Sequence, residues 1–210
     1  ITIRHIAAPQ HKTNPDYLNA VWYRRTVTVP NSWAGKRVLL HFQAVDYDTT
    51  VWVNDTEVGR HRGDFSSFRC DLHGVAEAGQ EITIVVRARD DNATAKPRGK
   101  QAKEFFGHGA LYGRVTGVWQ TVWLEPVPHV ALRRTRITPD VANSMIRLEQ
   151  PLTALQRGLR LRATLSDEKG QIVTAEVAAD RDFAPRLDLP IPADRRRLWS
   201  ISDPHLYDLT

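Results

Sequence analysis

The feature that most constrains the fold is a series of short apolar segments between Val38 and Asp91, interrupted by turn residues about every ten positions. These segments are rich in Val, Ile, Leu and Trp, and none keeps a helical period of apolar residues. Asn54-Asp55 stands where a tight hairpin requires positive φ, which predicts that Thr49–Val53 folds back onto Glu57–His61. The pattern therefore predicts an all-β sandwich.

Further strands are expected on both sides of this series. Arg37–Ala44 is almost continuously apolar, as in a strand that is covered on both faces. Gly117–Pro126 is predicted to be one closing strand, with Trp119 and Trp123 on the same face. We expect that face to be buried, so that replacing either tryptophan by alanine would strongly destabilise the domain.

A second domain is predicted after Pro126-Val127-Pro128, which has the composition of a short, stiff linker. The expected boundaries are 1–128 and 129–210. Strand-length segments without a helix favour an immunoglobulin-like sandwich for the second domain. These segments are His129–Thr138, Ser144–Glu149, Gly158–Ser166, Gln171–Ala179 and Arg186–Ile191.

Composition excludes several classes of function. The net charge is +5, but residues 1–128 hold 16 Lys and Arg against 13 Asp and Glu, and residues 129–210 hold 13 against 11, so no basic patch predicts nucleic-acid binding. No apolar run approaches the length of a membrane span, about 20 residues. The single cysteine, Cys70, permits no internal disulfide and fits a cytoplasmic location, although a removed leader peptide stays open.

Four motifs in order resemble one known family. They are Trp22-Tyr23-Arg24-Arg25, Val45-Asp46-Tyr47 leading into Val51-Trp52-Val53-Asn54, Val58-Gly59-Arg60-His61-Arg62-Gly63, and Thr116-Gly117-Val118-Trp119-Gln120-Thr121-Val122-Trp123-Leu124-Glu125. Their order and spacing resemble the N-terminal sugar-binding domain of family-2 glycoside hydrolases, the relatives of β-galactosidase, β-glucuronidase and β-mannosidase. The resemblance implies a jelly-roll, galactose-binding-like sandwich followed by the immunoglobulin-like one.

The resemblance also implies where the chemistry lies. Retaining enzymes of this family use two glutamates on a (β/α)₈ barrel, and this sequence has no alternation of strands and helices, so we assign no catalytic residue. Leu198–Leu209 resembles the entry to a late strand of the family's second domain. We therefore expect a fragment of a longer enzyme, with the second domain incomplete at its C-terminal end, its own catalytic barrel as partner, and a homo-oligomer as one possible assembly.

Candidate substrate-binding residues lie in the long irregular segment from Asp90 to Tyr112. Its Arg-Gly-Lys-Gln run resembles the family's own loop at this point, which by resemblance reaches toward the barrel mouth and helps to shape the pocket for the sugar. Carboxylates can accept hydrogen bonds from sugar hydroxyls, and cationic and amide groups can donate hydrogen bonds to sugar oxygens. An aromatic ring can stack on a sugar face. The candidates are Asp90, Asp91, Arg98, Lys100, Gln101 and Tyr112, with Phe105 or Phe106 as further stacking rings.

The remaining candidate residues are interpreted as structural, and two alternative functions stay open. Asp46 and Asp48 are interpreted as turn-capping residues at the start of a strand. The eight histidines show no ligand spacing, so neither a metal nor another cofactor is expected. Two alternatives to a glycosidase fragment remain: a free-standing carbohydrate-binding module or lectin, and a pair of structural spacer domains.

Overall fold

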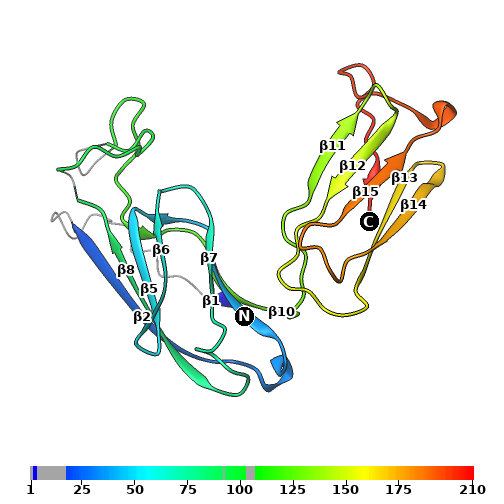
Figure 1. Ribbon diagram of the computed structural model, residues 1–210. Coiled ribbons are helices and arrows are strands. Elements are labelled where there is room, and N and C mark those ends of the chain that lie inside the picture. Colours follow the sequence, from blue (N-terminus) through cyan, green and yellow to red (C-terminus); the bar gives the residue numbers. More distant parts are fainter. Residues whose placement is uncertain (1, 4–17, 92, 103–106) are drawn as a thin grey trace. The chain divides into compact units, whose positions relative to one another are not determined.

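The computed structural model describes residues 2–3, 18–91, 93–102 and 107–210. The chain divides into two compact units, Ile1–Pro128 and His129–Thr210 (Figure 1). The described residues form antiparallel sheets and two single-turn 3₁₀ segments, η1 (Asn31–Trp33) and η2 (Ala193–Arg195). The all-β prediction is therefore confirmed. No helix in the described ranges is long and apolar enough to cross a membrane.

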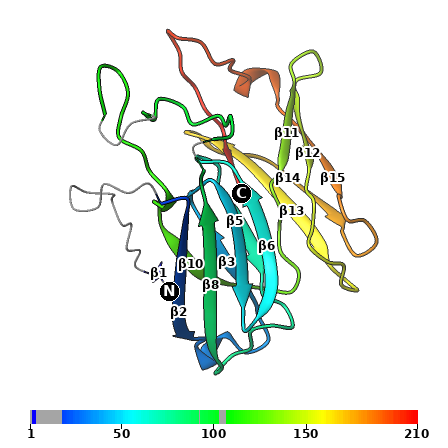
Figure 2. The same ribbon diagram turned by 90° about the vertical axis from the view of Figure 1, so that its left-hand side faces the viewer.

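The first unit is built from two four-stranded sheets and a short third one (Figure 2). One sheet has the order β1-β10-β3-β7, the other β2-β8-β5-β6, and β4 pairs with β9. The strands are β1 (Thr2–Ile3), β2 (Ala20–Thr28), β3 (Arg37–Phe42), β4 (Val45–Asp46), β5 (Asp48–Val53), β6 (Thr56–Arg62), β7 (Phe68–Asp71), β8 (Glu81–Arg89), β9 (Gly117–Val118) and β10 (Val122–Val127).

The two large sheets share one apolar core. Alternation along β8 buries Ile82, Ile84, Val86 and Ala88 on the inner face, as expected for a strand that is wet on its other side. The opposite sheet supplies residues such as Leu40, Phe42, Cys70, Val122 and Leu124 to the same cluster.

The expected hairpin is confirmed. Asn54 and Asp55 have φ of 47° and 66°, and β5 pairs antiparallel with β6. Positive φ at both central residues is the conformation that tight hairpins require, and the Asn-Asp pair tolerates it.

The predicted closing strand is wrong in two respects. Gly117–Pro126 is interrupted after Val118, so that β9 pairs with β4 while β10 pairs with β3. The buried face is formed by Val118, Val122 and Leu124, and not by the tryptophans. Trp123 instead stacks flat on His41 on the outer side, with ring centroids 4.7 Å apart.

Gly117 allows the chain to pass close to β2 of the sheet β2-β8-β5-β6 at this point. Its φ is +97°, and a Cβ atom there would lie 2.1 Å from the Tyr23 hydroxyl. That hydroxyl accepts a hydrogen bond from Val118 N at 3.1 Å. Only glycine combines this backbone conformation with the approach.

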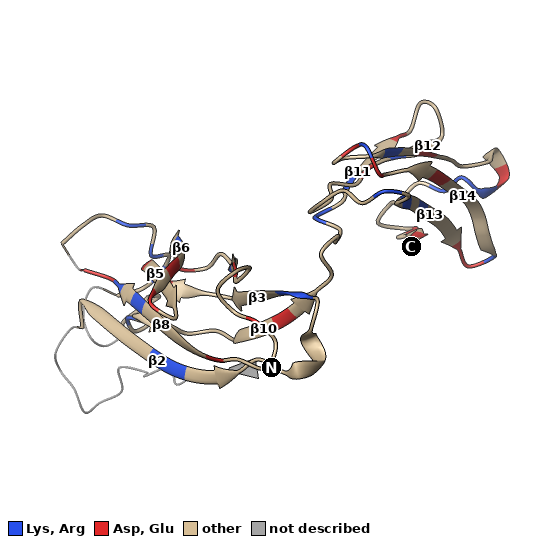
Figure 3. Cartoon of the chain, turned by 60° about the horizontal axis from the view of Figure 1, so that its bottom comes forward, with Lys and Arg blue, Asp and Glu red and all other residues tan. Residues whose placement is uncertain are grey.

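The second unit pairs two three-stranded sheets, β11-β12-β15 and β14-β13-β16. Its strands are β11 (Arg136–Asp140), β12 (Met145–Glu149), β13 (Arg160–Asp167), β14 (Gly170–Ala178), β15 (Arg186–Pro190) and β16 (Asp208–Leu209). Its core joins leucines of both sheets, among them Leu148, Leu165 and Leu189. Basic and acidic residues are distributed over both units (Figure 3).

Candidate functional site

A long loop leaves the sandwich at the end of β8 and returns into β9 (Figure 1). Its described parts, 93–102 and 107–116, are pinned to each other by backbone hydrogen bonds. Tyr112 N donates to Lys100 O at 2.9 Å and Ala102 N donates to Tyr112 O at 2.8 Å, which forms a parallel bridge between Gln101 and Tyr112. The two described parts of the loop therefore lie side by side and are joined by backbone hydrogen bonds.

Buried charges hold this loop to the end of β8. The Asp90 side chain is fully buried, and its carboxylate accepts hydrogen bonds from Lys96 Nζ (3.0 Å), Arg98 Nη2 (2.9 Å) and Arg114 (Nε 3.1 Å, Nη2 3.0 Å). Arg114 also donates to the Asp90 carbonyl. A buried carboxylate needs such partners to be tolerated. Asp90 is thus committed to cations of both ends of the loop.

Asp91 fixes the first turn of the loop. Its Oδ1 accepts from Thr94 N at 2.9 Å and from Thr94 Oγ1 at 2.7 Å, and its Oδ2 accepts from Lys96 Nζ at 3.1 Å. The Thr94 hydrogen bonds, followed by the bond from Lys96, hold the pKa of Asp91 well below its ordinary value. Asp91 is therefore an anion that organises the loop.

A second buried pair of carboxyls lies beneath Gln101. Asp46 on β4 and Asp64 after β6 are 0% and 2% exposed. Gln101 Nε2 donates to Asp46 Oδ2 at 2.8 Å and to Asp64 Oδ2 at 3.2 Å, and Gln101 Oε1 accepts from Val115 N at 3.0 Å. One amide therefore links the loop to β4 and to the segment that follows β6.

Both carboxyls have a pKa raised above the ordinary value of Asp. Burial raises the pKa of Asp46 to about 7, aided by the nearby charges of Asp90 and Asp64 and opposed by the Gln101 hydrogen bond. Burial likewise raises the pKa of Asp64. Two adjacent buried carboxyls cannot both ionise cheaply, so the pair titrates as a unit.

Aromatic side chains line the outer side of the loop. Phe65 and Tyr112 are 53% and 43% exposed, and the Phe65 ring meets the Trp119 indole edge-on at 6.0 Å. Gly99, at φ +60°, lies between the first two, because a Cβ there would be 3.3 Å from the Tyr112 hydroxyl and 3.4 Å from Phe65 Cζ. Trp119 is anchored by donating to Asp64 O at 2.9 Å. Beside them an open hollow of about 430 Å³ is lined by residues of 93–102, among them Thr94, Lys96 and Arg98.

The structure sorts the six candidate residues into two groups. Asp90, Asp91, Arg98 and Gln101 turn toward the protein, where each makes the hydrogen bonds given above. Lys100 and Tyr112 are exposed. Phe105 and Phe106 lie outside the described residues.

Sequence reasoning missed half of the network. Asp46 was interpreted as a turn cap, yet it is a fully buried partner of Asp64 and Gln101. A carboxylate between Val45 and Tyr47, in an apolar run, was the available signal. Lys96 and Arg114 carried no comparable signal, because their partner Asp90 is 6 and 24 positions away.

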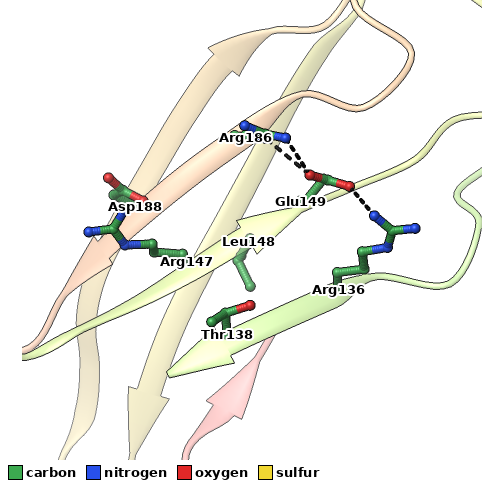
Figure 4. A pocket seen from close by; sticks show the side chains of 7 residues that line it. All are labelled: Arg136, Thr138, Arg147, Leu148, Glu149, Arg186 and Asp188. Atoms are coloured by element: carbon green, nitrogen blue, oxygen red, sulfur yellow. Dashed lines mark hydrogen bonds and ion pairs between the residues drawn. The ribbon is translucent and has the colours of Figure 1, made fainter. Parts of the chain in front are cut away.

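Neither a metal centre nor the hollow on the second unit is a strong candidate site in the described residues. Within the described ranges, no group of three or more His, Cys, Asp and Glu could hold a metal ion. In the second unit, a hollow of about 570 Å³ lies over β11, β12 and β15, where Glu149 is clamped by Arg136 and Arg186 (Figure 4). The hollow is lined mainly by exposed charged side chains that pair with one another. We therefore expect little affinity for a small molecule there.

Comparison with known proteins identifies the first unit. Residues 4–98 match the family described as "Glycosyl hydrolases family 2, sugar binding domain". A β-glucuronidase of Paenibacillus borealis is 28% identical over 208 residues, which cover 92% of this chain and 33% of that protein. The chain thus spans a third or less of the length of the curated relatives that it matches, 33% in this case and 26% for a β-galactosidase of Thermoanaerobacter pseudethanolicus.

Solved structures agree on the fold. A Ruminococcus gnavus β-glucuronidase superimposes with a TM-score of 0.68 at 20% identity, over 97% of this chain and 34% of that one. A putative β-galactosidase of Bacteroides fragilis gives a TM-score of 0.69 at 24% identity, over 92% of this chain and 30% of that one. This family's domain implies a jelly roll, in agreement with the two four-stranded sheets. Residues 4–98 of this chain therefore belong to the sugar binding domain of glycosyl hydrolases family 2.

Proposed function

We propose that this chain is the non-catalytic N-terminal part of a retaining β-glycosidase. Its two units, a jelly roll and an immunoglobulin-like sandwich, brace a catalytic barrel that carries both catalytic carboxyls. The loop from Asp90 to Arg114 forms part of the wall around the substrate sugar. The names of the relatives, β-glucuronidase and β-galactosidase, support a β-glucuronide or β-galactoside as substrate.

The observation that carries this proposal is the way the loop is held. A segment without regular structure is fixed by the buried Asp90 cluster and by Gln101 on the Asp46–Asp64 pair, while Lys100 and Tyr112 stay exposed. Because these contacts already hold the described parts of the loop, those parts lose little conformational entropy when they contact a ligand. Buried supporting groups behind exposed ones are how proteins position a binding surface.

The proposal is tested on the full-length parent protein with 4-nitrophenyl β-glucuronide, β-galactoside and β-mannoside. We expect hydrolysis of at least one, and we expect Tyr112→Ala and Lys100→Ala to raise KM more than they lower kcat, since neither residue touches the reacting bond. Lys36→Ala and Phe183→Ala are matched controls, because both side chains are exposed far from the loop in the sequence. Unchanged KM in both loop variants would refute the role of the loop.

The 210-residue chain alone gives the complementary test. We expect no turnover of the three reporters above background, because the mechanism needs two carboxyls about 5–5.5 Å apart that we place on the barrel. Turnover by the purified chain would overturn the proposal. Sub-millimolar binding of a simple monosaccharide, measured by calorimetry, would favour the lectin alternative instead.

A further inference from the structure

Two tryptophans stand on the outer face of the sheet β2-β8-β5-β6. Trp22 on β2 and Trp52 on β5 stack with ring centroids 5.7 Å apart and an interplanar angle of 17°. Trp22 is 61% exposed, although tryptophan is highly buried on average. Its neighbour Tyr23 turns inward to the core, so alternation along β2 fixes the outward direction of Trp22.

Arginines surround these rings. Trp22 pairs in register with Arg87 on β8, and Arg87 with Thr50 on β5. The Arg87 guanidinium lies 5.9 Å from the Trp22 ring and 6.0 Å from the Trp52 ring, and its Nη2 donates to Thr50 Oγ1 at 3.1 Å. Arg24 follows Trp22 by two positions and therefore shares its face. We call Trp22, Arg24, Trp52 and Arg87 the Trp22 face.

The arginines of the Trp22 face have no direct ion pair. In the described part of the chain, neither Arg24 nor Arg87 lies within ion-pair distance of a carboxylate. Glu57, the register partner of Trp52, is near enough for its charge to interact with Arg87, but its carboxylate is held by Arg60 at 2.8 Å. A cation without a direct ion pair, beside an accessible indole ring, offers a ligand two kinds of contact. The ring can take an apolar surface, and the guanidinium can take an anion.

Sugars with a carboxylate match both functions. A pyranose ring presents C–H groups on its faces and polar groups at its rim, so that it can lie flat on an indole while a rim carboxylate meets a guanidinium. A protein partner would also use tryptophan and arginine, which are both enriched at interfaces, but a stable protein interface needs about 800 Å² on each partner, whereas two stacked rings match the size of a short saccharide. We propose that the Trp22 face binds a uronate unit of an acidic oligosaccharide.

This site is separate from the loop. Arg87 precedes Arg89, the last residue of β8, so the Trp22 face lies on the flat of the sheet just before the chain turns into the loop. A saccharide chain held there would be kept near the loop without depending on it. The proposal does not rest on the proposed glycosidase function, since binding is measured on the 210-residue chain itself.

The test is a titration of this chain with a hyaluronan hexasaccharide, which alternates glucuronate with N-acetylglucosamine, against the neutral chitin hexasaccharide. We expect the acidic sugar to bind, to quench tryptophan fluorescence, and to lose affinity as salt rises. Trp22→Ala should weaken binding by about tenfold, as expected for the loss of one aromatic contact. Arg24→Ala should reduce the preference for the acidic sugar.

A matched control separates this site from the other surfaces. Trp199→Ala removes a tryptophan of similar exposure, 60%, from the second unit and should leave the affinity unchanged. Absence of binding, equal binding of the neutral sugar, or full affinity in Trp22→Ala would each overturn the proposal. In the full-length protein, a Trp22 side chain that is shielded from an aqueous quencher would also overturn it, because the face would then be covered by another part of the protein.

Discussion

Asp90 in the first unit and Glu149 in the second hold arginines in similar ways but in different surroundings. Asp90 is fully buried, and the side chains of its partners Arg114 and Lys96 are 2% and 5% exposed. Glu149 bridges Arg136 and Arg186 across three strands, and those arginines are 76% and 78% exposed. Removing a buried charge strands its partners without water, whereas exposed partners are rehydrated. Similar ion pairs therefore contribute differently to stability. The Asp90 cluster holds the loop in place, whereas the Glu149 ion pairs on the surface of the sheet contribute little.

The largest expected effect is on the buried cluster. Asp90→Asn leaves three cations without their shared anion and should reduce the stability of the first unit by about 3–5 kcal/mol. Urea denaturation followed by tryptophan fluorescence is suitable, because five of the six tryptophans precede Pro128. Arg98→Ala is a milder version, since Arg98 is 15% exposed. A loss below about 1 kcal/mol in Asp90→Asn would show that the cluster is wet in solution and would remove the contrast with Glu149.

A second prediction applies the same contrast to apolar groups on β10. Leu124→Ala should cost about 2–5 kcal/mol, because Leu124 is 2% exposed between the sheets. Trp123→Ala should cost less, since its ring lies outside on His41. Denaturation curves of the two variants check the order. If Trp123→Ala were the more damaging, the original expectation of a buried tryptophan face would be restored.

The sequence predicted the frame of the first unit and not the details that make the site. Residues that are local in sequence were predictable, since Asn54-Asp55 specifies its own turn and β8 shows its alternation directly. The faces of β10 were not, because both carry apolar residues and only the partner sheet decides which is buried. The Asp46–Asp64 pair was not predictable either, because the two residues meet only through the fold.

The third prediction concerns the pH dependence of stability and applies to the buried carboxyls of the first unit, Asp46 and Asp64. The folded-state pKa of Asp46 is raised to about 7, so the folded state binds a proton that the unfolded state releases at lower pH. This contribution to stability is complete below the ordinary Asp value of 3.8 and is lost as pH rises through about 7. Both carboxylates then repel each other and the charge of Asp90 beneath the loop.

Hydrogen exchange of residues 98–102 and 111–116 measures this effect. We expect their protection, corrected for intrinsic exchange, to fall between about pH 5 and about pH 8. Asp64→Asn removes one acid and should make the protection depend less on pH. Glu149→Gln, on the surface of the second unit, should leave the pH dependence unchanged. Equal pH dependence in the parent chain and in Asp64→Asn would show that the two carboxyls do not titrate as a unit.

The smallest expected effect is on the exposed ion pairs of Glu149 with Arg136 and Arg186. Glu149→Gln keeps the shape of the side chain and removes the charge that Arg136 and Arg186 share, and we expect a loss of about 1 kcal/mol or less. The two arginines then repel each other across β12, but water screens them, so the loss should shrink further at high salt. Because fluorescence of the second unit depends on Trp199 alone, hydrogen exchange of β12 and β15 is the better measurement. A loss as large as that of Asp90→Asn, insensitive to salt, would mean that this face is shielded from water in solution, and the distinction between the two clusters would fail.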